Sequence, residues 1–195
     1  FDAQCDDARL TIATIRSALA HGAQVTNHAR VTELLRADGR IHGARLEDAL
    51  TGATVDVQAR VVVNATGPWC DTLRRMAAPD ATPLLRTTKG AHVMVRRSRL
   101  GHEAAITLTS PIDGRVMFVI PWGEFSYIGT TDTDSTEDPD LVTASAEDVV
   151  YLLRSANAAF PNARLSEADV LATWAGLRAL IAPGGRLYEQ RNVTW

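Results

Sequence analysis

The spacing of apolar and polar residues predicts different structures in the two halves of the chain. In the first half, apolar residues at close to helical spacing predict a helix over residues 6–20: Leu10, Ile12, Ile15 and Leu19. Alternation and turn residues then predict four short strands, at residues 23–27, 29–36, 40–47 and 54–59. Asp38-Gly39 is typical of a two-residue hairpin turn. The first half is therefore expected to be a helix followed by a β-meander.

A run of three valines, Val61 to Val63, closes this half. An apolar, β-branched run favours a strand that is covered on both faces, as in a parallel sheet. Small and turn-forming residues end the run, and residues 70–76 are predicted to form a short helix. The small residues Ala65, Thr66 and Gly67 would let the backbone approach a nucleotide closely. An ordinary strand-to-helix turn is the alternative interpretation of the same residues.

The second half is predicted to contain a largely antiparallel sheet. Residues 77–83 have the composition of a linker, and they lead into a series of hairpins. Strands are expected at residues 93–95, 105–109, 115–121, 125–129, 170–174 and 187–195, and a helix is expected to begin at Ser145. We therefore predict an α+β fold with two domains, at residues 1–78 and 83–195.

Composition narrows the classes of function. The chain is 46% hydrophobic and 22% charged, as soluble globular proteins are. Its net charge of -3 does not favour a nucleic-acid partner. No apolar run approaches the roughly 20 residues of a membrane-spanning helix. Two cysteines are too few for a disulfide framework or a zinc site, which favours a reducing compartment.

Two short segments carry candidate chemistry. Lys89-Gly90-Ala91-His92 is interpreted as a break before the strand at residues 93–95, bringing a cation and a titratable imidazole together. Histidine suits proton transfer near neutral pH, although a lone histidine on a strand is more often structural. Arg178 follows Gly176 at a predicted strand bend, where a guanidinium could hold phosphate or carboxylate. A surface arginine is the alternative. Residues 129–133 (GTTDT) are interpreted as structural, because their acid spacing does not fit a metal loop.

Five segments together resemble FAD-dependent glycerol-3-phosphate dehydrogenases, within the wider glycine-oxidase and D-amino-acid-oxidase superfamily. They are FDAQCDDARL at residues 1–10, NATGPW at 64–69, KGAH at 89–92, RVMFVIPWGEFSYIGTTDT at 115–133 and WAGLRAL at 174–180. Their order along the chain is also that of the family. Ala179 stands where the family motif has proline, and Arg191 is followed by Asn192 where the family usually has an acid.

The resemblance implies a site that uses FAD. His92 would transfer a proton or polarise the hydroxyl. Three arginines would hold the substrate's phosphate, Arg178, Arg115 and Arg191, and Lys89 would also bind the substrate. The implied cofactor contacts are Arg30 and Val31, which would lie near the adenine, and Ala65, Thr66, Gly67, Trp69 and Gly90. The partial FAD-binding lobe would then comprise the helix, the meander and the parallel strand.

The implied reaction is oxidation of sn-glycerol 3-phosphate, a phosphorylated polyol, to dihydroxyacetone phosphate, with electrons passing through FAD to quinone. A cytoplasmic location is expected, with peripheral contact to the inner face of the plasma membrane as a further expectation. The chain lacks a G-x-G-x-x-G segment and a C-terminal glycine-rich segment, so we expect a middle fragment that does not itself hold FAD and is inactive alone. The alternatives are an amine or amino-acid oxidase of the same superfamily, and a non-enzymatic binding module.

Overall fold

The computed structural model describes residues 3–182 and divides the chain into two compact units. The first unit comprises residues 1–65 and 72–81, and the second comprises 66–71 and 82–195. The helix α2 (Cys70–Ala77) runs across the division. The domain assignment at residues 1–78 and 83–195 stays a prediction. The strand expected at residues 187–195, with Arg191, lies outside the described residues.

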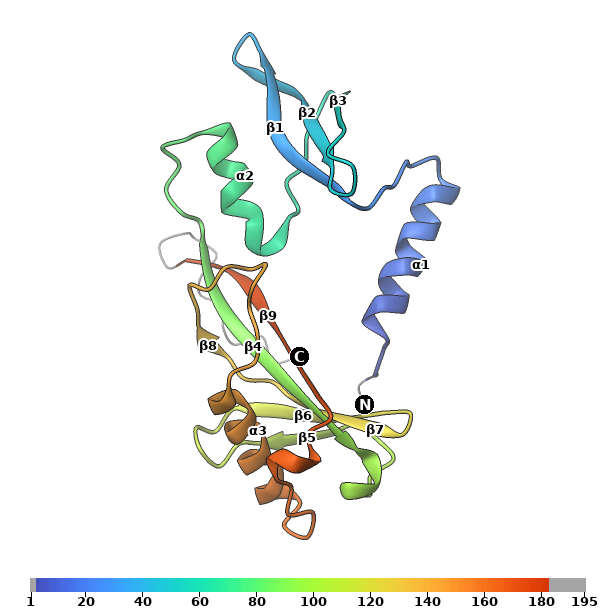
Figure 1. Cartoon of the computed structure of the whole chain (residues 1–195), viewed down its shortest axis with the longest axis vertical. Coiled ribbons are helices and arrows are strands. Elements are labelled where there is room, and N and C mark those ends of the chain that lie inside the picture. Colours follow the sequence, from blue (N-terminus) through green and yellow to red (C-terminus); the bar gives the residue numbers. More distant parts are fainter. Residues whose placement is uncertain (1–2, 183–195) are drawn as a thin grey trace. The chain divides into compact units, whose positions relative to one another are not determined.

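The first unit contains a helix and a three-stranded antiparallel sheet (Figure 1). Helix α1 (Asp7–Ala20) begins at Asp6, whose carboxylate accepts a hydrogen bond from the backbone N–H of Arg9. Strands β1 (Ala29–Ala37), β2 (Arg40–Asp48) and β3 (Thr54–Gln58) follow in that order. Asp38 and Gly39 both have positive φ angles, 49° and 73°, and they join β1 to β2. The predicted hairpin is therefore confirmed.

Two predicted strands of this unit are wrong. Within the described residues, segments 23–27 and 61–63 are not strands. The side chains of Val61 and Val63 are 74% and 80% exposed. A β-branched run becomes a strand only where a neighbouring strand pairs with its backbone, and the described residues provide no such neighbour here.

The second unit is built on a six-stranded antiparallel sheet. Its strands are β4 (Leu85–Arg96), β5 (Ile106–Thr109), β6 (Val116–Trp122), β7 (Phe125–Gly129), β8 (Thr133–Asp134) and β9 (Ala172–Ile181). β4 is the longest strand and pairs with three others, β7, β8 and β9. The short 3-10 helices η1 (Gly67–Trp69), η2 (Arg97–Arg99) and η3 (Glu167–Asp169) complete the described elements.

The predicted break at residues 89–92 is also wrong, and the bend predicted at Gly176 does not interrupt its strand. Residues 89–92 and 176–178 lie inside the continuous strands β4 and β9, where Gly90 is paired with Gly176. Glycine is a weak strand former, so each segment alone resembles an interruption. Pairing along ten residues of both strands holds the glycines in extended backbone instead.

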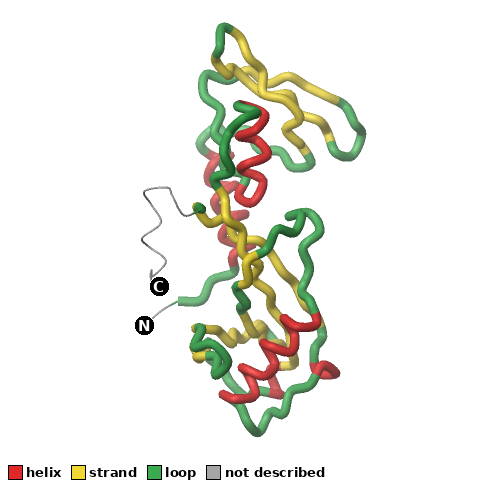
Figure 2. The backbone as a smooth tube through the Cα atoms, turned by 90° about the vertical axis from the view of Figure 1, so that its left-hand side faces the viewer, coloured by secondary structure: helices red, strands yellow, loops and turns green. Residues whose placement is uncertain are grey.

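The sheet has one covered face and one open face. Val93, Val95 and Ile128 are fully buried on the covered face, against Leu152 and other residues of α3 (Ala146–Ala159). Figure 2 shows α3 running along one side of these strands. Ser145 and Asp148 form a capping box at the start of α3, confirming its predicted start. The open face carries the candidate site.

Candidate functional site

Strand register brings the candidate residues onto the open face of the sheet. His92 of β4 lies opposite Gly129 of β7 and Trp174 of β9. Arg178 of β9 lies opposite Thr88, four residues before His92 on β4. Because side chains alternate between faces along a strand, and directly opposite residues share a face, these side chains lie on the same face.

Arg178 is held by the segment between β7 and β8. One terminal nitrogen, Nη1, donates to Oδ1 of Asp132 at 3.2 Å, and the other, Nη2, donates to Oγ1 of Thr130 at 2.9 Å. Both nitrogens also lie 3.3 Å from the carbonyl oxygen of Thr131. The guanidinium is therefore fixed in place while its side chain remains 36% exposed.

Gly90 makes room for this guanidinium. A Cβ atom at Gly90 would lie 2.5 Å from Nη2 of Arg178 and 2.7 Å from Oγ1 of Thr130. Gly90 and His92 are two residues apart on β4, which corresponds to roughly 6–7 Å along a strand. The guanidinium thus extends from β9 across β4 toward the imidazole.

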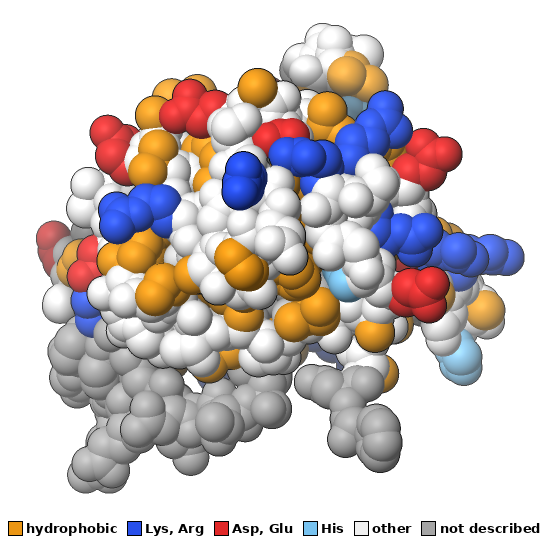
Figure 3. Space-filling view, turned by 90° about the horizontal axis from the view of Figure 1, so that it is seen from below, with side chains coloured by type: hydrophobic (Ala, Val, Ile, Leu, Met, Phe, Trp, Pro, Cys, Tyr) orange, Lys and Arg blue, Asp and Glu red, His pale blue; other side chains and the backbone are white. Residues whose placement is uncertain are grey.

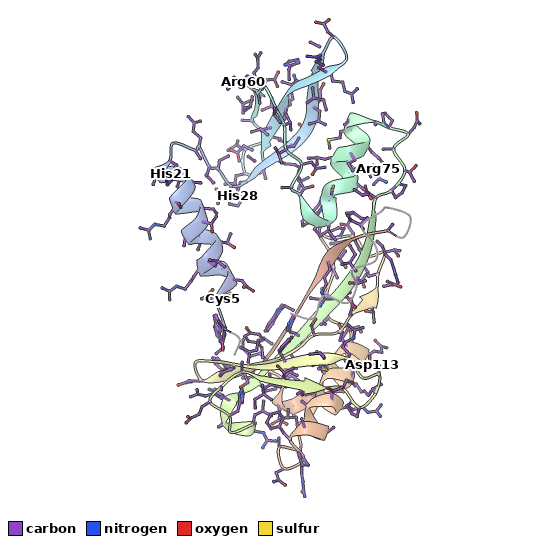
Figure 4. All side chains as sticks on the ribbon, turned by 180° about the vertical axis from the view of Figure 1, so that it is seen from behind. Cys5, His21, His28, Arg60, Arg75 and Asp113 are labelled. Carbon is purple, nitrogen blue, oxygen red and sulfur yellow. The ribbon has the colours of Figure 1, made fainter. Side chains whose placement is uncertain are left out.

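Arg115 is the second arginine of the cluster. Its Nη1 donates to Oδ2 of Asp132 at 3.0 Å, and its Nε lies 3.8 Å from a carboxylate oxygen of Asp113. Asp113 lies in the turn between β5 and β6, labelled in Figure 4, and also accepts a hydrogen bond from Tyr151 of α3 at 2.9 Å. Arg115 and Arg178 therefore bind opposite oxygens of a single carboxylate, that of Asp132.

The carboxyl group of Asp132 is ionised at neutral pH. Burial on its own would raise the pKa of Asp132, but the neighbouring Thr88 hydroxyl and the charges of Arg115 and Arg178 outweigh it and hold the pKa below its usual value. Asp113 also lies 3.8 Å from Arg115, so the cluster contains two guanidinium cations and two carboxylates, and its charges are balanced.

His92 lies in an aromatic setting. Its ring stacks on Trp174 with centroids 5.2 Å apart and planes 8° apart, and it meets the edge of Tyr127 at 6.0 Å. A Cβ atom at Gly129 would lie 2.0 Å from Cδ2 of His92, so the ring rests against the glycine backbone. Nδ1 is buried and has no hydrogen-bond partner among the described residues.

The imidazole of His92 favours its neutral form. Burial, and secondarily the positive charge of Arg178, lower the pKa of His92 below its usual value. At neutral pH the ring therefore keeps one nitrogen unprotonated and able to accept a proton.

Lys89 lies on the covered face of the sheet. Its Nζ is 2.9 Å from Oδ2 of Asp148 and 3.5 Å from a carboxylate oxygen of Glu137. The side chains of Lys89 and Asp148 are only 10% and 6% exposed. The hydrogen bond to Asp148 is the main reason that the pKa of Lys89 is raised. The structure therefore gives Lys89 a contact with α3 and places it away from Arg178, and its substrate role stays an untested prediction.

The residues predicted to contact a cofactor are distributed over both units. In the first unit, Arg30 and Val31 lie in β1 opposite Glu47 and Leu46, and Ala65 is the last residue of that unit's first segment. In the second unit, Thr66 precedes η1, which contains Gly67 and Trp69 and packs against β9. A Cβ atom at Gly67 would meet no atom of the described residues within 4 Å, and its φ angle is +55°. The backbone at Gly67 is therefore open to a close approach, whereas the space above Gly90 is taken by Arg178.

Sequence reasoning missed four residues of the site: Thr130, Asp132, Gly129 and Trp174. Trp174 belongs to the WAGLRAL segment, but its stacking on His92 depends on the pairing of β4 with β9. Asp132 lies 46 residues before Arg178 in the chain, and only the folded sheet brings them together. The interpretation of residues 129–133 as structural was thus incomplete.

Elsewhere, the described residues show no metal site and no membrane-spanning helix. Residues 3–182 contain no group of three or more His, Cys, Asp or Glu arranged to hold a metal ion. Over the same residues, the helices are too short or too polar to cross a membrane. A hollow of about 470 Å³ is lined by Arg96, Arg97, His102 and their neighbours, away from the site residues. Figure 3 shows positive and negative side chains interspersed on the face that it presents.

Comparison with known proteins identifies the family. The model of the family described as "FAD dependent oxidoreductase" matches residues 1–194. The chain therefore belongs to this family of FAD-dependent oxidoreductases, and the resemblance noted in the sequence is confirmed.

Two similar proteins have names that refer to glycerol phosphate. The chain is 42% identical over 187 residues to the alpha-glycerophosphate oxidase of Enterococcus casseliflavus, covering 94% of this chain and 31% of that protein. It is 36% identical to the aerobic glycerol-3-phosphate dehydrogenase of Staphylococcus haemolyticus, covering 93% of this chain and 33% of that protein. The chain thus spans about a third of the length of these relatives.

A solved structure supports the fold. The glycerol-3-phosphate dehydrogenase of Bacillus halodurans, whose structure is described as complexed with FAD, has a TM-score of 0.88 and 40% sequence identity to this chain. The match covers 92% of this chain and 36% of that one. The predicted α+β fold class is therefore confirmed.

Proposed function

We propose that this chain supplies the substrate-facing part of an FAD-dependent enzyme that oxidises sn-glycerol 3-phosphate to dihydroxyacetone phosphate. The observation that carries the proposal is the open face of the sheet in the second unit. There a neutral imidazole, His92, lies roughly 6–7 Å along β4 from Gly90, over which the guanidinium of Arg178 extends. A three-carbon phosphate ester is of a length to span these two groups.

The arginine cluster binds the phosphate in this proposal. Charged N–H groups form strong hydrogen bonds to phosphate oxygens. Among the described residues, Arg178 makes its four hydrogen bonds through its terminal nitrogens and keeps Nε–H, whereas Arg115 contacts Asp132 and Asp113 through Nη1 and Nε and keeps both N–H groups of Nη2. Two arginines suit a phosphate dianion better than the single carboxylate of an amino acid. The cluster therefore favours a glycerol phosphate over the substrates of an amine or amino-acid oxidase.

His92 takes the proton of the substrate's C2 hydroxyl. Its lowered pKa keeps the ring neutral at the pH of the cell, and its unprotonated nitrogen accepts the proton as the hydrogen on C2 leaves as hydride. When bound, FAD supplies the two-electron acceptor for that hydride. Stacking on Trp174 and contact with Gly129 hold the imidazole in one orientation during this step.

The described residues fit a flavin in two respects. The aromatic rings of Trp174 and Tyr127 beside His92 form a partly exposed surface that suits a planar ring system. Gly67 offers open backbone for close approach, and its neighbours in the sequence, Ala65, Thr66 and Trp69, are proposed as further cofactor contacts. Arg30 and Val31 are proposed for the adenine end of the cofactor. Because the chain spans about a third of its relatives, we propose that it works within a longer protein.

Quinone is the proposed electron acceptor, with the enzyme in the cytoplasm and in peripheral contact with the inner face of the plasma membrane. The relatives described above include both an oxidase and a dehydrogenase. Measuring reoxidation of the substrate-reduced full-length protein by a soluble quinone and by oxygen would decide between acceptors. Reoxidation by oxygen alone would contradict the quinone proposal.

A substrate screen tests the reaction itself. The full-length flavoprotein should reduce its FAD with sn-glycerol 3-phosphate and not with glycine or sarcosine. His92→Ala should lower kcat by at least about 100-fold, the usual range for a general base, and change KM far less. Flavin reduction by glycine or sarcosine, with none by glycerol phosphate, would refute the proposal in favour of an amine oxidase.

A further inference from the structure

Asp132 occupies a central position in the arginine cluster. Oδ1 accepts a hydrogen bond from Arg178 at 3.2 Å, and Oδ2 accepts one from Arg115 at 3.0 Å. These arginines come from different parts of the sheet, Arg178 from β9 and Arg115 from the residue before β6. Asp132 itself follows β7, so one carboxylate links three separate segments of the second unit.

The contacts of Asp132 restrain both guanidinium groups. Long arginine side chains lose conformational entropy when they are fixed, and a charged hydrogen-bond partner offsets that loss before any ligand arrives. The Asp132 side chain is only 23% exposed, so its hydrogen bonds are less weakened by water than those of a surface pair. Among the described residues, Nε–H of Arg178 and the two N–H groups of Nη2 of Arg115 have no hydrogen-bond partner and remain for a ligand.

Asp132 also carries a negative charge into a site that is proposed to bind a phosphate. If charge alone mattered, this carboxylate would weaken anion binding, because it removes one unit of positive charge from a cluster in which Asp113 already faces Arg115. If the orientation of the arginines matters more, the carboxylate would strengthen phosphate binding by holding both guanidinium groups in position. The two effects have opposite signs, so an experiment separates them.

We infer that Asp132 is a positioning residue that orients Arg178 and Arg115 for a phosphate monoester dianion. This inference rests on the proposed function of the same site. Asp132 acts through the arginines and does not touch the substrate. Its loss should therefore change substrate affinity more than the chemical step.

The test is titration of the full-length flavoprotein with inorganic phosphate by calorimetry. Asp132→Asn should weaken phosphate binding about tenfold, the effect of losing one charge-assisted contact. KM for glycerol phosphate should rise by a similar factor, with kcat changed less than about threefold. Asp132→Glu, which keeps the charge, should recover affinity to within about threefold of the wild type.

Asp134→Asn is the matched control. Asp134 lies two residues further along the chain, pairs with Arg86 and is 62% exposed. Its replacement removes the same charge without touching Arg115 or Arg178, and phosphate affinity should stay within about twofold of the wild type. Flavin absorbance and the thermal unfolding midpoint of each variant establish that it is folded.

A double-mutant cycle shows whether Asp132 acts through Arg178. In an Arg178→Ala background, Asp132→Asn should weaken phosphate binding much less than it does in the wild type, because one of the oriented groups is gone. Full additivity, or phosphate binding by Asp132→Asn that is as tight as in the wild type or tighter, would overturn the inference. Phosphate titration does not depend on turnover, so a wild type that binds phosphate but does not oxidise glycerol phosphate would count against the proposed reaction alone.

Discussion

The two faces of the sheet in the second unit use neighbouring residues of one strand for different purposes. On the covered face, Lys89 pairs with Asp148 of α3, and Val93 belongs to the apolar core. On the open face, Gly90 receives the guanidinium of Arg178, and His92 stacks on Trp174. The four-residue segment KGAH therefore supplies structure through its odd-numbered positions and the candidate site through its even-numbered positions.

The two faces differ in whether their polar groups have partners within the protein. On the covered face, a charge that is removed from water is balanced at once by an opposite charge, as for Lys89. On the open face, Nε–H of Arg178 and Nδ1 of His92 have no hydrogen-bond partner among the described residues. Unfilled hydrogen-bonding capacity on a partly buried surface is what a ligand uses. Substitutions on the two faces should therefore affect different measurements.

The largest expected effect is on the covered face. Leu152 is fully buried between α3 and the sheet. Leu152→Ala should lower the free energy of unfolding by about 3–4 kcal/mol, from lost burial and the cavity that remains. Phosphate affinity of the folded protein should not change, because Leu152 is on the other side of the sheet from Arg178. Denaturant unfolding measures the free energy of unfolding, and calorimetry measures the phosphate affinity. A Leu152→Ala variant that loses both would contradict separate roles for the two faces.

Arg178→Ala should have the opposite effects, with a large loss of activity and little loss of stability. Removal of this guanidinium should lower kcat/KM for glycerol phosphate roughly 100-fold. This corresponds to a loss of about 3 kcal/mol of transition-state stabilisation, as expected when a bound anion loses a charged partner. Arg178→Lys should recover only part of this, because an ammonium cannot form the two-pronged contact. The unfolding free energy should change by less than about 1 kcal/mol, because the side chain is 36% exposed. Near-normal kcat/KM in Arg178→Ala would remove the phosphate role.

The glycine pair on β4 and β9 offers a finer comparison. Gly90 and Gly176 are opposite each other, yet a Cβ atom at Gly90 would overlap Arg178, whereas one at Gly176 would meet no described atom within 4 Å. Gly90→Ala should displace the guanidinium and weaken phosphate binding about tenfold, or roughly 1.4 kcal/mol. Gly176→Ala should leave binding unchanged and stabilise the strand slightly. Equal phosphate affinities in the two variants would show that Gly90 does not set the position of Arg178.

Much of the fold could be predicted from local sequence signals. Asp38-Gly39 gave the hairpin of the first unit, and Ser145 marked the start of α3, since both depend on neighbouring residues. The run at residues 61–63 failed because a strand depends on a partner that the run itself does not contain. Gly90 failed as a strand break because its pairing with β9 is nonlocal.

The candidate site could be predicted only in part. His92 and Arg178 were chosen as individual residues, and the structure places both on the open face. The sequence could not show that Asp132 links Arg178 to Arg115, because the three residues are far apart in the chain and meet through strand pairing. Nor could it separate Lys89 from His92, because the alternation of faces becomes known only once the segment is recognised as a continuous strand.

The smallest expected effect is a dependence of stability on pH that arises at His92. Burial and the charge of Arg178 lower the pKa of His92 in the folded protein, whereas the unfolded chain should have the ordinary value of about 6.5. Between these two pKa values the unfolded state binds more protons than the folded state. The contribution of His92 to stability should therefore fall as pH decreases below about 6.5 and become constant below the folded pKa.

Comparison with His92→Gln isolates this contribution from those of the other titrating groups. The difference in unfolding free energy between wild type and His92→Gln should shift against the wild type as pH is lowered from about 7 to about 5. Arg178→Gln should reduce this shift, because loss of the nearby positive charge brings the pKa of His92 closer to its ordinary value. Lys89→Gln, on the covered face, should not alter it. A difference that is independent of pH over this range would mean that His92 titrates as it does in the unfolded chain, and that the open face does not hold its imidazole in the neutral form.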